Sequence, residues 1–171
     1  MYKTQVKELG GARCAALYAH TRMLLDAACA VGEDFTMPVL LRATGLDAGK
    51  ALSALQVALR ANIVEPKPEE TGYRFVHPVM REVLYANLSS GARASLHAAI
   101  GCALEVLGQL EPPLAELAHH IHCAAAEPYH ERAARYGRLA GAAALKAMAY
   151  DEAVQFYAWA LEAQAHFSSP D

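Results

Sequence analysis

A histidine, His77, lies where a short strand is expected to give way to a helix. The turn residues Thr71-Gly72 come first, the segment from Tyr73 to His77 alternates as a strand does, and Pro78 follows at a position that suits the start of a helix. An imidazole at a helix N-terminus offers an N–H donor where the helix dipole already favours anions. His77 is therefore a candidate anion-binding residue. The alternative is a partly exposed histidine at the edge of the core that bonds to the backbone.

A second group of side chains could ligate a metal ion, because histidine and cysteine are common zinc ligands. Its members stand close together in the sequence: His119, His120, His122 and Cys123. At about 100° per residue, His119, His122 and Cys123 fall in one arc of a helix, opposite its apolar stripe. One helix cannot enclose a tetrahedral ion without a partner. We therefore favour helix packing as the role of these histidines and expect no metal site.

The segment Gly45–Ala51 resembles a phosphate-binding loop only superficially. It is one residue too short for the Walker A pattern, lacks the Ser or Thr that binds magnesium, and follows no apolar strand. The sequence also contains no convincing Ser/His/Asp, Cys/His or paired-carboxylate arrangement. We therefore expect no catalytic residues, no enzyme activity and no cofactor held by this chain itself.

Composition and charge favour a protein partner over a nucleic acid. The 171 residues are 54% hydrophobic, with a net charge of −3, and residues 96–171 hold nine acidic and four basic side chains. Phosphate contacts need clustered Lys and Arg, so this acidic part is unsuited to DNA or RNA. The four cysteines form no CxxC pair. No apolar run is long enough to span a bilayer, and we expect a cytoplasmic protein without membrane contact.

The pattern of apolar residues predicts a mainly α protein with two parts after a linker or upstream tail at residues 1–22. In residues 23–95, helices ending near Gly32, Gly45 and Asn62 precede a β-hairpin, which is the plan of a winged helix, a helix-turn-helix with a hairpin wing. Residues 96–171 read as helices only. We interpret them as an incomplete α-solenoid arm of tetratricopeptide type. The supporting residues have that repeat's offsets: Gly141, Ala153, Tyr157 and Ala160.

The helix expected from Pro78 to Leu88 has a clear apolar periodicity. Its predicted core face comprises Val79, Met80, Val83, Leu84 and Leu88. Arg81, Glu82 and Tyr85 are expected to lie off that face.

Four blocks of sequence resemble one protein family. They are LDAACAVGEDF at residues 25–35, RFVHPVMREVLY at 74–85, RASLHAA at 93–99 and ELAHH at 116–120. In this order they resemble the signal-transduction ATPases with numerous domains, in the bacterial branch of large LuxR-type regulators and adenylate-cyclase-linked ATPases. The resemblance covers residues 23–165 and implies the winged helix and helical arm that follow the ATPase core in that family.

The resemblance also implies a role for His77. It matches the histidine of the family's Met-His-Asp signature, which reaches the phosphates of bound ADP, whereas Pro78 stands where the family has Asp. ATP or ADP would then be bound only by the core of a parent protein. The implied function is a non-catalytic regulatory fragment, whose winged helix relays the nucleotide state of a missing ATPase core to a protein-binding arm.

An alternative is a DNA-binding winged-helix transcriptional regulator with a tetratricopeptide-like dimerisation arm. The expected recognition helix offers few base-reading side chains, namely Lys50, Ser53, Gln56 and Arg60, so DNA binding by this chain is disfavoured.

The last helix is rich in aromatic residues. We expect Phe156, Tyr157 and Trp159 to form a surface for protein partners, such as the ATPase core, further repeats or a second copy of the chain.

Overall fold

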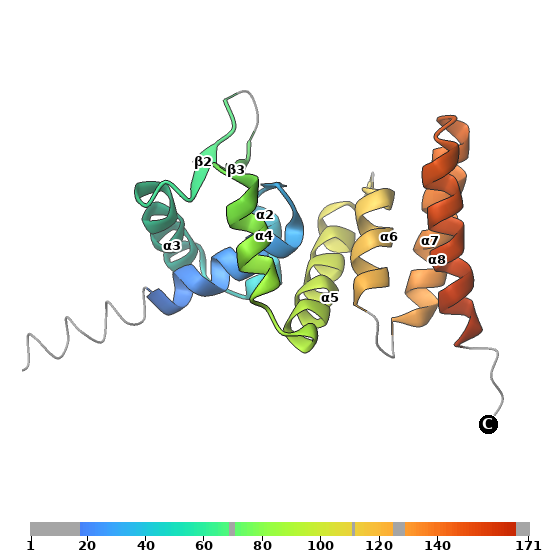
Figure 1. Cartoon of the computed structure of the whole chain (residues 1–171), viewed down its shortest axis with the longest axis horizontal. Helices are drawn as coiled ribbons and strands as arrows, with labels where there is room; N and C mark the ends of the chain where they lie inside the picture. Colours follow the sequence, from blue (N-terminus) through green and yellow to red (C-terminus); the bar gives the residue numbers. More distant parts are fainter. Residues whose placement is uncertain (1–17, 69–70, 111, 125–128, 167–171) are drawn as a thin grey trace, which may run out of the picture. The chain divides into compact units, whose positions relative to one another are not determined.

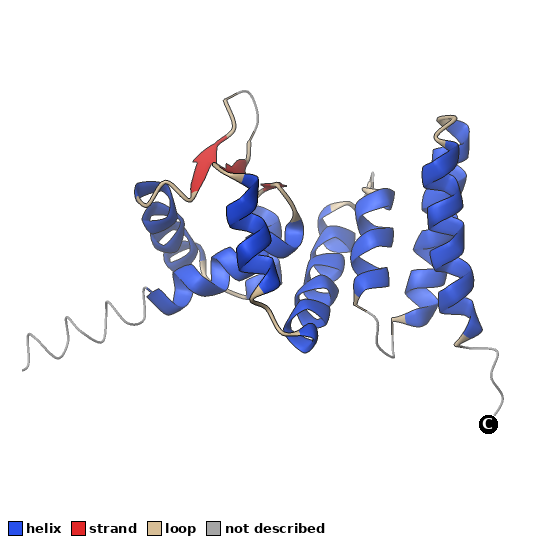
Figure 2. Ribbon diagram, viewed as in Figure 1, coloured by secondary structure: helices blue, strands red, loops and turns tan. Residues whose placement is uncertain are grey.

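The computed structural model describes residues 18–68, 71–110, 112–124 and 129–166. The chain divides between Leu88 and Ser89 into two compact units. The division precedes the expected boundary at residue 95 because Ser89 caps a helix that belongs wholly to the second unit: its hydroxyl accepts a hydrogen bond from the amide of Ala92 (3.2 Å). The described part is mainly α-helical, as predicted, with one small antiparallel sheet (Figures 1 and 2).

The first unit alternates helices with very short strands. A helix over residues 18–31 comes first. It is followed by β1 (Asp34–Phe35), α2 (Met37–Thr44), α3 (Ala48–Arg60), β2 (Val64–Pro66), β3 (Tyr73–Phe75) and α4 (Pro78–Ala86). The strands are ordered β1-β3-β2, so the central strand is the second arm of the predicted hairpin. β1 was not predicted. Phe35 pairs with Tyr73 in the sheet, and its ring also lies 5.7 Å from that of Phe75.

The helix ends in this unit follow the local sequence. Gly45 ends α2 in a left-handed conformation (φ 68°), which glycine adopts without a steric penalty. Asp47 begins α3, and its carboxylate accepts a hydrogen bond from the amide of Lys50 at 2.9 Å. The core beneath these helices is apolar and fully buried, and its largest members include Leu24, Leu40, Leu55 and Val64.

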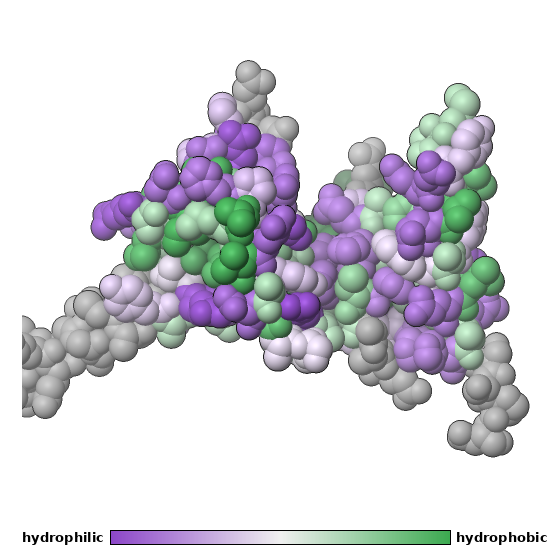
Figure 3. Space-filling model, in the orientation of Figure 1, coloured by the Kyte–Doolittle hydropathy of each residue, from purple (hydrophilic) through white to green (hydrophobic). Residues whose placement is uncertain are grey.

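The prediction for the buried face of α4 was wrong for Val79 and Val83, whereas Leu88 is buried and Met80 and Leu84 are half-buried. Val79 and Val83 are 59% and 55% exposed, and the helix contains no fully buried residue. Arg81 lies instead on the inner side, where its Nε donates to the carbonyl oxygen of Cys29 (3.1 Å). A long arginine stem can cover apolar surface as an aliphatic chain does, so periodicity alone did not fix the rotation of the helix. Figure 3 shows hydrophobic surface over α4.

The described residues of the second unit form four helices. They are α5 (Ser90–Leu107), α6 (Leu114–Cys123), α7 (His130–Lys146) and α8 (Tyr150–Ala165). Each packs against the next, and α6 also contacts α8. None of the described helices of the protein is both long and apolar enough to cross a membrane.

Glycines allow the helices of this unit to approach closely. A Cβ added at Gly101 of α5 would overlap the side chain of Ile121 on α6. On α7, a Cβ at Gly137 would lie 2.8 Å from the carbonyl oxygen of Phe156, and one at Gly141 would lie 2.9 Å from the ring of Tyr157. At these glycines the backbone of one helix contacts the neighbouring helix directly, in the pair α5–α6 and in the pair α7–α8. These contacts determine which residues of the paired helices face each other.

Candidate functional site

His77 lies at the junction that the sequence predicted. It is the N-cap residue of α4, in extended conformation (φ −129°, ψ 122°), and its exposed side chain makes no capping hydrogen bond. The backbone is held on both sides: the amide of Val76 donates to Ile63 and the amide of Met80 donates to the carbonyl of His77. The imidazole is thus presented to solvent from a fixed backbone.

The surroundings of His77 suit an anion electrostatically. The first turn of α4 carries no acidic residue, so no side chain there offsets the positive end of the helix dipole. Pro78 has no N–H, which removes one of the donors that a helix N-terminus usually offers. An anion at this point would be bound by the imidazole of His77 and by the helix end.

The exposed face of α3 has little unpaired positive charge. Lys50, Ser53, Gln56 and Arg60 are all exposed, as a recognition helix would require. However, Lys50 forms an ion pair with Asp47 at 2.8 Å. The sheet shows the same pairing of opposite charges, in Arg74–Glu65 (2.7 Å) and Lys67–Asp34 (2.8 Å). These pairs weaken the attraction of this unit for a phosphate backbone.

The segment Gly45–Ala51 connects two helices. It contains the C-cap of α2 and the first residues of α3, and a helix rather than a strand directly precedes it. This is not the strand-to-helix setting of a phosphate-binding loop.

Three histidines meet in the second unit. His97 of α5 and His120 of α6 are both 2% exposed, and their Nδ1 atoms lie 2.8 Å apart. The exposed His119 sets its ring edge-on to both, with centroid distances of 5.6 Å to His97 and 5.1 Å to His120. A hydrogen bond between two Nδ1 atoms requires one ring to donate and the other to accept.

Of the other two candidate ligands, Cys123 adjoins this trio and His122 points to another helix. His122 faces α8, and Cys123 is 3.9 Å from the ring nitrogens of His119. Sequence reasoning placed His119, His122 and Cys123 together on one arc and did not consider His97 as a site residue. The only signal in the sequence was the lone histidine of RASLHAA, His97. It lies 23 residues upstream of His120 and on a different helix, α5, so helical spacing could not connect the two residues.

Phe156, Tyr157 and Trp159 of α8 make contacts within the unit, and Phe156 is buried. Phe156 is only 8% exposed, and Tyr157 covers Gly141. Trp159 stacks on His122 with ring centroids 4.6 Å apart. The exposed apolar surface of α8 is instead a stripe at helical spacing, which we call the α8 stripe: Tyr150, Val154, Ala158, Leu161 and Ala165. Its largest members, Tyr150, Val154 and Leu161, are 62%, 70% and 68% exposed.

Burial shifts several pKa values. It lowers the pKa of His122 below its ordinary value of 6.5, and the nearby carboxylate of Glu162 opposes this shift. It raises the pKa of the Cys123 thiol, and it raises that of Cys29 to about 11, to which the charge of Asp26 also contributes. Both cysteines therefore remain protonated thiols at neutral pH, a form with low reactivity.

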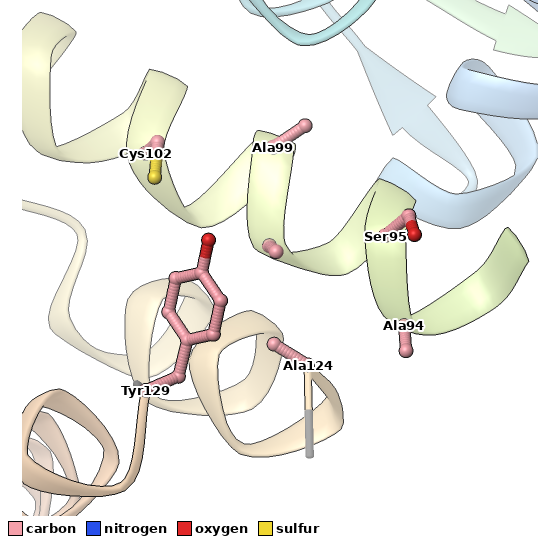
Figure 4. Close-up of a pocket in the computed structure, with 7 residues that line it drawn as sticks. Ala94, Ser95, Ala99, Cys102, Ala124 and Tyr129 are labelled. Atoms are coloured by element: carbon pink, nitrogen blue, oxygen red, sulfur yellow. The ribbon is translucent and has the colours of Figure 1, made fainter. Parts of the chain in front are cut away.

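A shallow pocket of ≈ 350 Å³ lies between α5 and the end of α6. Its lining consists mostly of small side chains: Ala94, Ser95, Ala98, Ala99, Cys102, Ala124 and Tyr129. Figure 4 shows the hydroxyl of Tyr129 pointing toward α5. Beside it, Arg132 forms an ion pair with Glu105 and lies over the Tyr129 ring at 5.3 Å. These contacts link α5 to α7.

No protein-family model, no curated protein and no solved structure matches this sequence.

Proposed function

We propose that the chain is a non-catalytic regulatory module: its first unit acts as a winged helix that relays the nucleotide state of an ATPase core, and its second unit is an arm that binds protein partners. The α8 stripe carries this proposal. A helix that leaves Val154 and Leu161 more than two-thirds exposed presents an apolar surface of the kind that marks an interaction site. Repeat arms bury such a face against the next helix or a partner.

Two features of the first unit support the relay. The order helix, strand, two helices and hairpin, with β1 paired to the second hairpin strand, is the order of elements in winged-helix domains. His77 presents an exposed imidazole at the start of α4, where an anion is favoured. The resemblance of residues 74–85 to the signal-transduction ATPases gives that anion an identity, the phosphates of a nucleotide held by the core.

The alternative is a DNA-binding regulator with the same arm. The exposed positions of Lys50, Ser53, Gln56 and Arg60 on α3 favour it. The ion pairs Lys50–Asp47 and Arg74–Glu65 oppose it, because those cations are already neutralised by carboxylates. Non-specific DNA binders have Kd values of about 10⁻⁴ to 10⁻⁶ M at physiological salt. We expect no salt-dependent shift of mixed-sequence duplex by the chain in that range, and a shift that weakens steeply with salt would favour the alternative.

Site-specific photo-crosslinking in the organism of origin tests the relay and the arm separately. A crosslinking amino acid at position 154 should capture protein through the α8 stripe, whereas one at Glu152, exposed on the same helix outside the stripe, should capture much less. A crosslinker at position 77 should join to a P-loop ATPase segment, with a yield that changes between ADP and a non-hydrolysable ATP analogue. Equal capture at 152 and 154 would refute the arm. Absence of any ATPase adduct at 77 would refute the relay.

A further inference from the structure

The histidine trio combines ligands from two helices that are held firmly together. His97, His119 and His120 can each offer one ring nitrogen, and these three atoms all lie within 4.8 Å of one another. Gly101, one turn after His97, contacts Ile121, the residue after His120, and has no Cβ that would separate the helices. His97 and His120 are buried, whereas His119 is exposed. The trio is therefore fixed on the inner side and reached from solvent on the outer side.

We propose that His97, His119 and His120 bind a divalent transition-metal ion of the zinc class. Neutral imidazoles are ligands for zinc, copper and nickel, whereas calcium and magnesium prefer oxygen, and this group contains no carboxylate. Three protein ligands with a fourth position open to water is an established zinc arrangement. The metal ion would enter from the exposed side of His119, and the fourth coordination position would face solvent on that side.

The distances require only small movements of the rings. Two nitrogens on one tetrahedral zinc ion lie about 3.4 Å apart, because each Zn–N bond is about 2.0–2.1 Å long. The Nδ1 atoms of His97 and His120, now 2.8 Å apart, therefore separate slightly when the metal enters between them. His119 moves inward by a similar side-chain rotation. The N–H···N bond is replaced by two bonds to the metal, and the donor ring shifts its proton from Nδ1 to Nε2, so this pair releases no net proton.

A metal at this point would bridge α5 and α6. Because it binds the folded arrangement in preference to the unfolded chain, it stabilises the unit by mass action. Trp159 would lie close to the metal, because its ring centre is 5.9 Å from that of His119. Trp159 is the chain's one tryptophan, so its fluorescence reports directly on the site.

The test uses the full chain after treatment with a chelator and removal of the chelator. Calorimetric titration with zinc chloride near neutral pH should give one ion per chain, together with a rise in melting temperature. Nickel chloride, a paramagnetic quencher, should reduce the fluorescence of Trp159 with the same saturation. Absence of a one-to-one zinc isotherm, or nickel saturation without quenching, overturns the proposal.

Variants separate the trio from other histidines. His119→Gln changes an exposed side chain, so the fold should persist. It should weaken zinc binding at least about tenfold, because even the loss of a residue that only supports a ligand weakens metal affinity about 10–100-fold. His122→Gln is the matched control on the same helix and should keep wild-type zinc affinity. His130 and His166 form a separate stacked pair, with centroids 4.3 Å apart. Unchanged affinity in His119→Gln, or loss of binding in His166→Gln instead, overturns the assignment.

Discussion

The imidazole of His122 lies flat against the indole of Trp159, with ring centroids 4.6 Å apart and 11° between the ring planes. The two residues belong to α6 and α8, which are separated in sequence by α7 but contact each other in the second unit. The stack therefore joins the first helix pair of the unit to its last helix. It also places a titratable ring, whose pKa is lowered by burial, against the chain's one tryptophan.

Acidification should weaken the second unit through His122. Its pKa is below 6.5 in the folded state, so the unfolded chain binds the proton more readily. The stability linked to His122 is therefore complete above pH 6.5 and is lost as pH falls through the lowered folded value. Urea denaturation followed by Trp159 fluorescence across this window should show a smaller loss of stability for His122→Gln than for the wild type. Identical pH profiles for the two proteins would show that His122 does not contribute to the pH dependence of stability.

Gly137→Ala should destabilise the pairing of α7 and α8. The added methyl group would lie 2.8 Å from the carbonyl oxygen of Phe156 and 2.9 Å from the Cβ of Ala160, so the helices must separate. Overpacking of this kind costs about 1–3 kcal/mol, whereas the helix propensity gained from Gly to Ala is at most about 1 kcal/mol. Urea denaturation at constant pH measures the difference.

Gly91→Ala is the control for that measurement. Gly91 is exposed in α5, and a Cβ there has nothing within 4 Å. Only the propensity term remains, so this variant should be neutral or more stable by up to about 1 kcal/mol. If both alanine variants changed stability alike, the close contact at Gly137 would not exist in solution.

Cys29 should resist alkylation while Cys102 reacts. Cys29 is 0% exposed, its Sγ contacts the carbonyl oxygen of Asp26 at 3.1 Å, and its pKa of about 11 keeps it protonated. Cys102 is partly exposed beside the pocket. Because the thiolate is the reactive form, iodoacetamide at neutral pH should modify Cys102 far faster than Cys29 in the native chain, and the two alike in urea. Peptide mass spectrometry reads both sites, and similar native rates would contradict the buried placement of Cys29.

The α8 stripe should drive self-association when no other partner is present. Two copies can bury the same apolar patch by symmetric pairing. Sedimentation of the wild type should show an assembly that grows with concentration, and Val154→Glu with Leu161→Glu should give monomers. A strictly monomeric wild type at high micromolar concentration would contradict this prediction. Phe156→Glu is unsuited to the test, because Phe156 is 8% exposed and its change would disturb the core.

Local chemistry in the sequence determined the class of fold and several helix ends. The apolar periodicity predicted a mainly α chain, and Gly45 ends a helix as expected. The capping residues Asp47 and Ser89 begin two further helices. The hairpin from Val64 to Phe75 was also predicted, although its second strand ends at Phe75 and not at His77. These features depend on interactions within a few residues of one another, which is the range that propensity and capping rules describe.

Tertiary packing decided the partners of the candidate site residues. The strand at Phe35 exists because Tyr73, far along the chain, pairs with it. The rotation of α4 depends on whether Arg81 or Val79 faces inward, and both choices satisfy the sequence pattern. His97 meets His120 where Gly101 lets α5 and α6 approach closely, and Trp159 meets His122 where α6 contacts α8. Such contacts depend on the crossing and rotation of whole helices, which the spacing of residues along one helix does not specify.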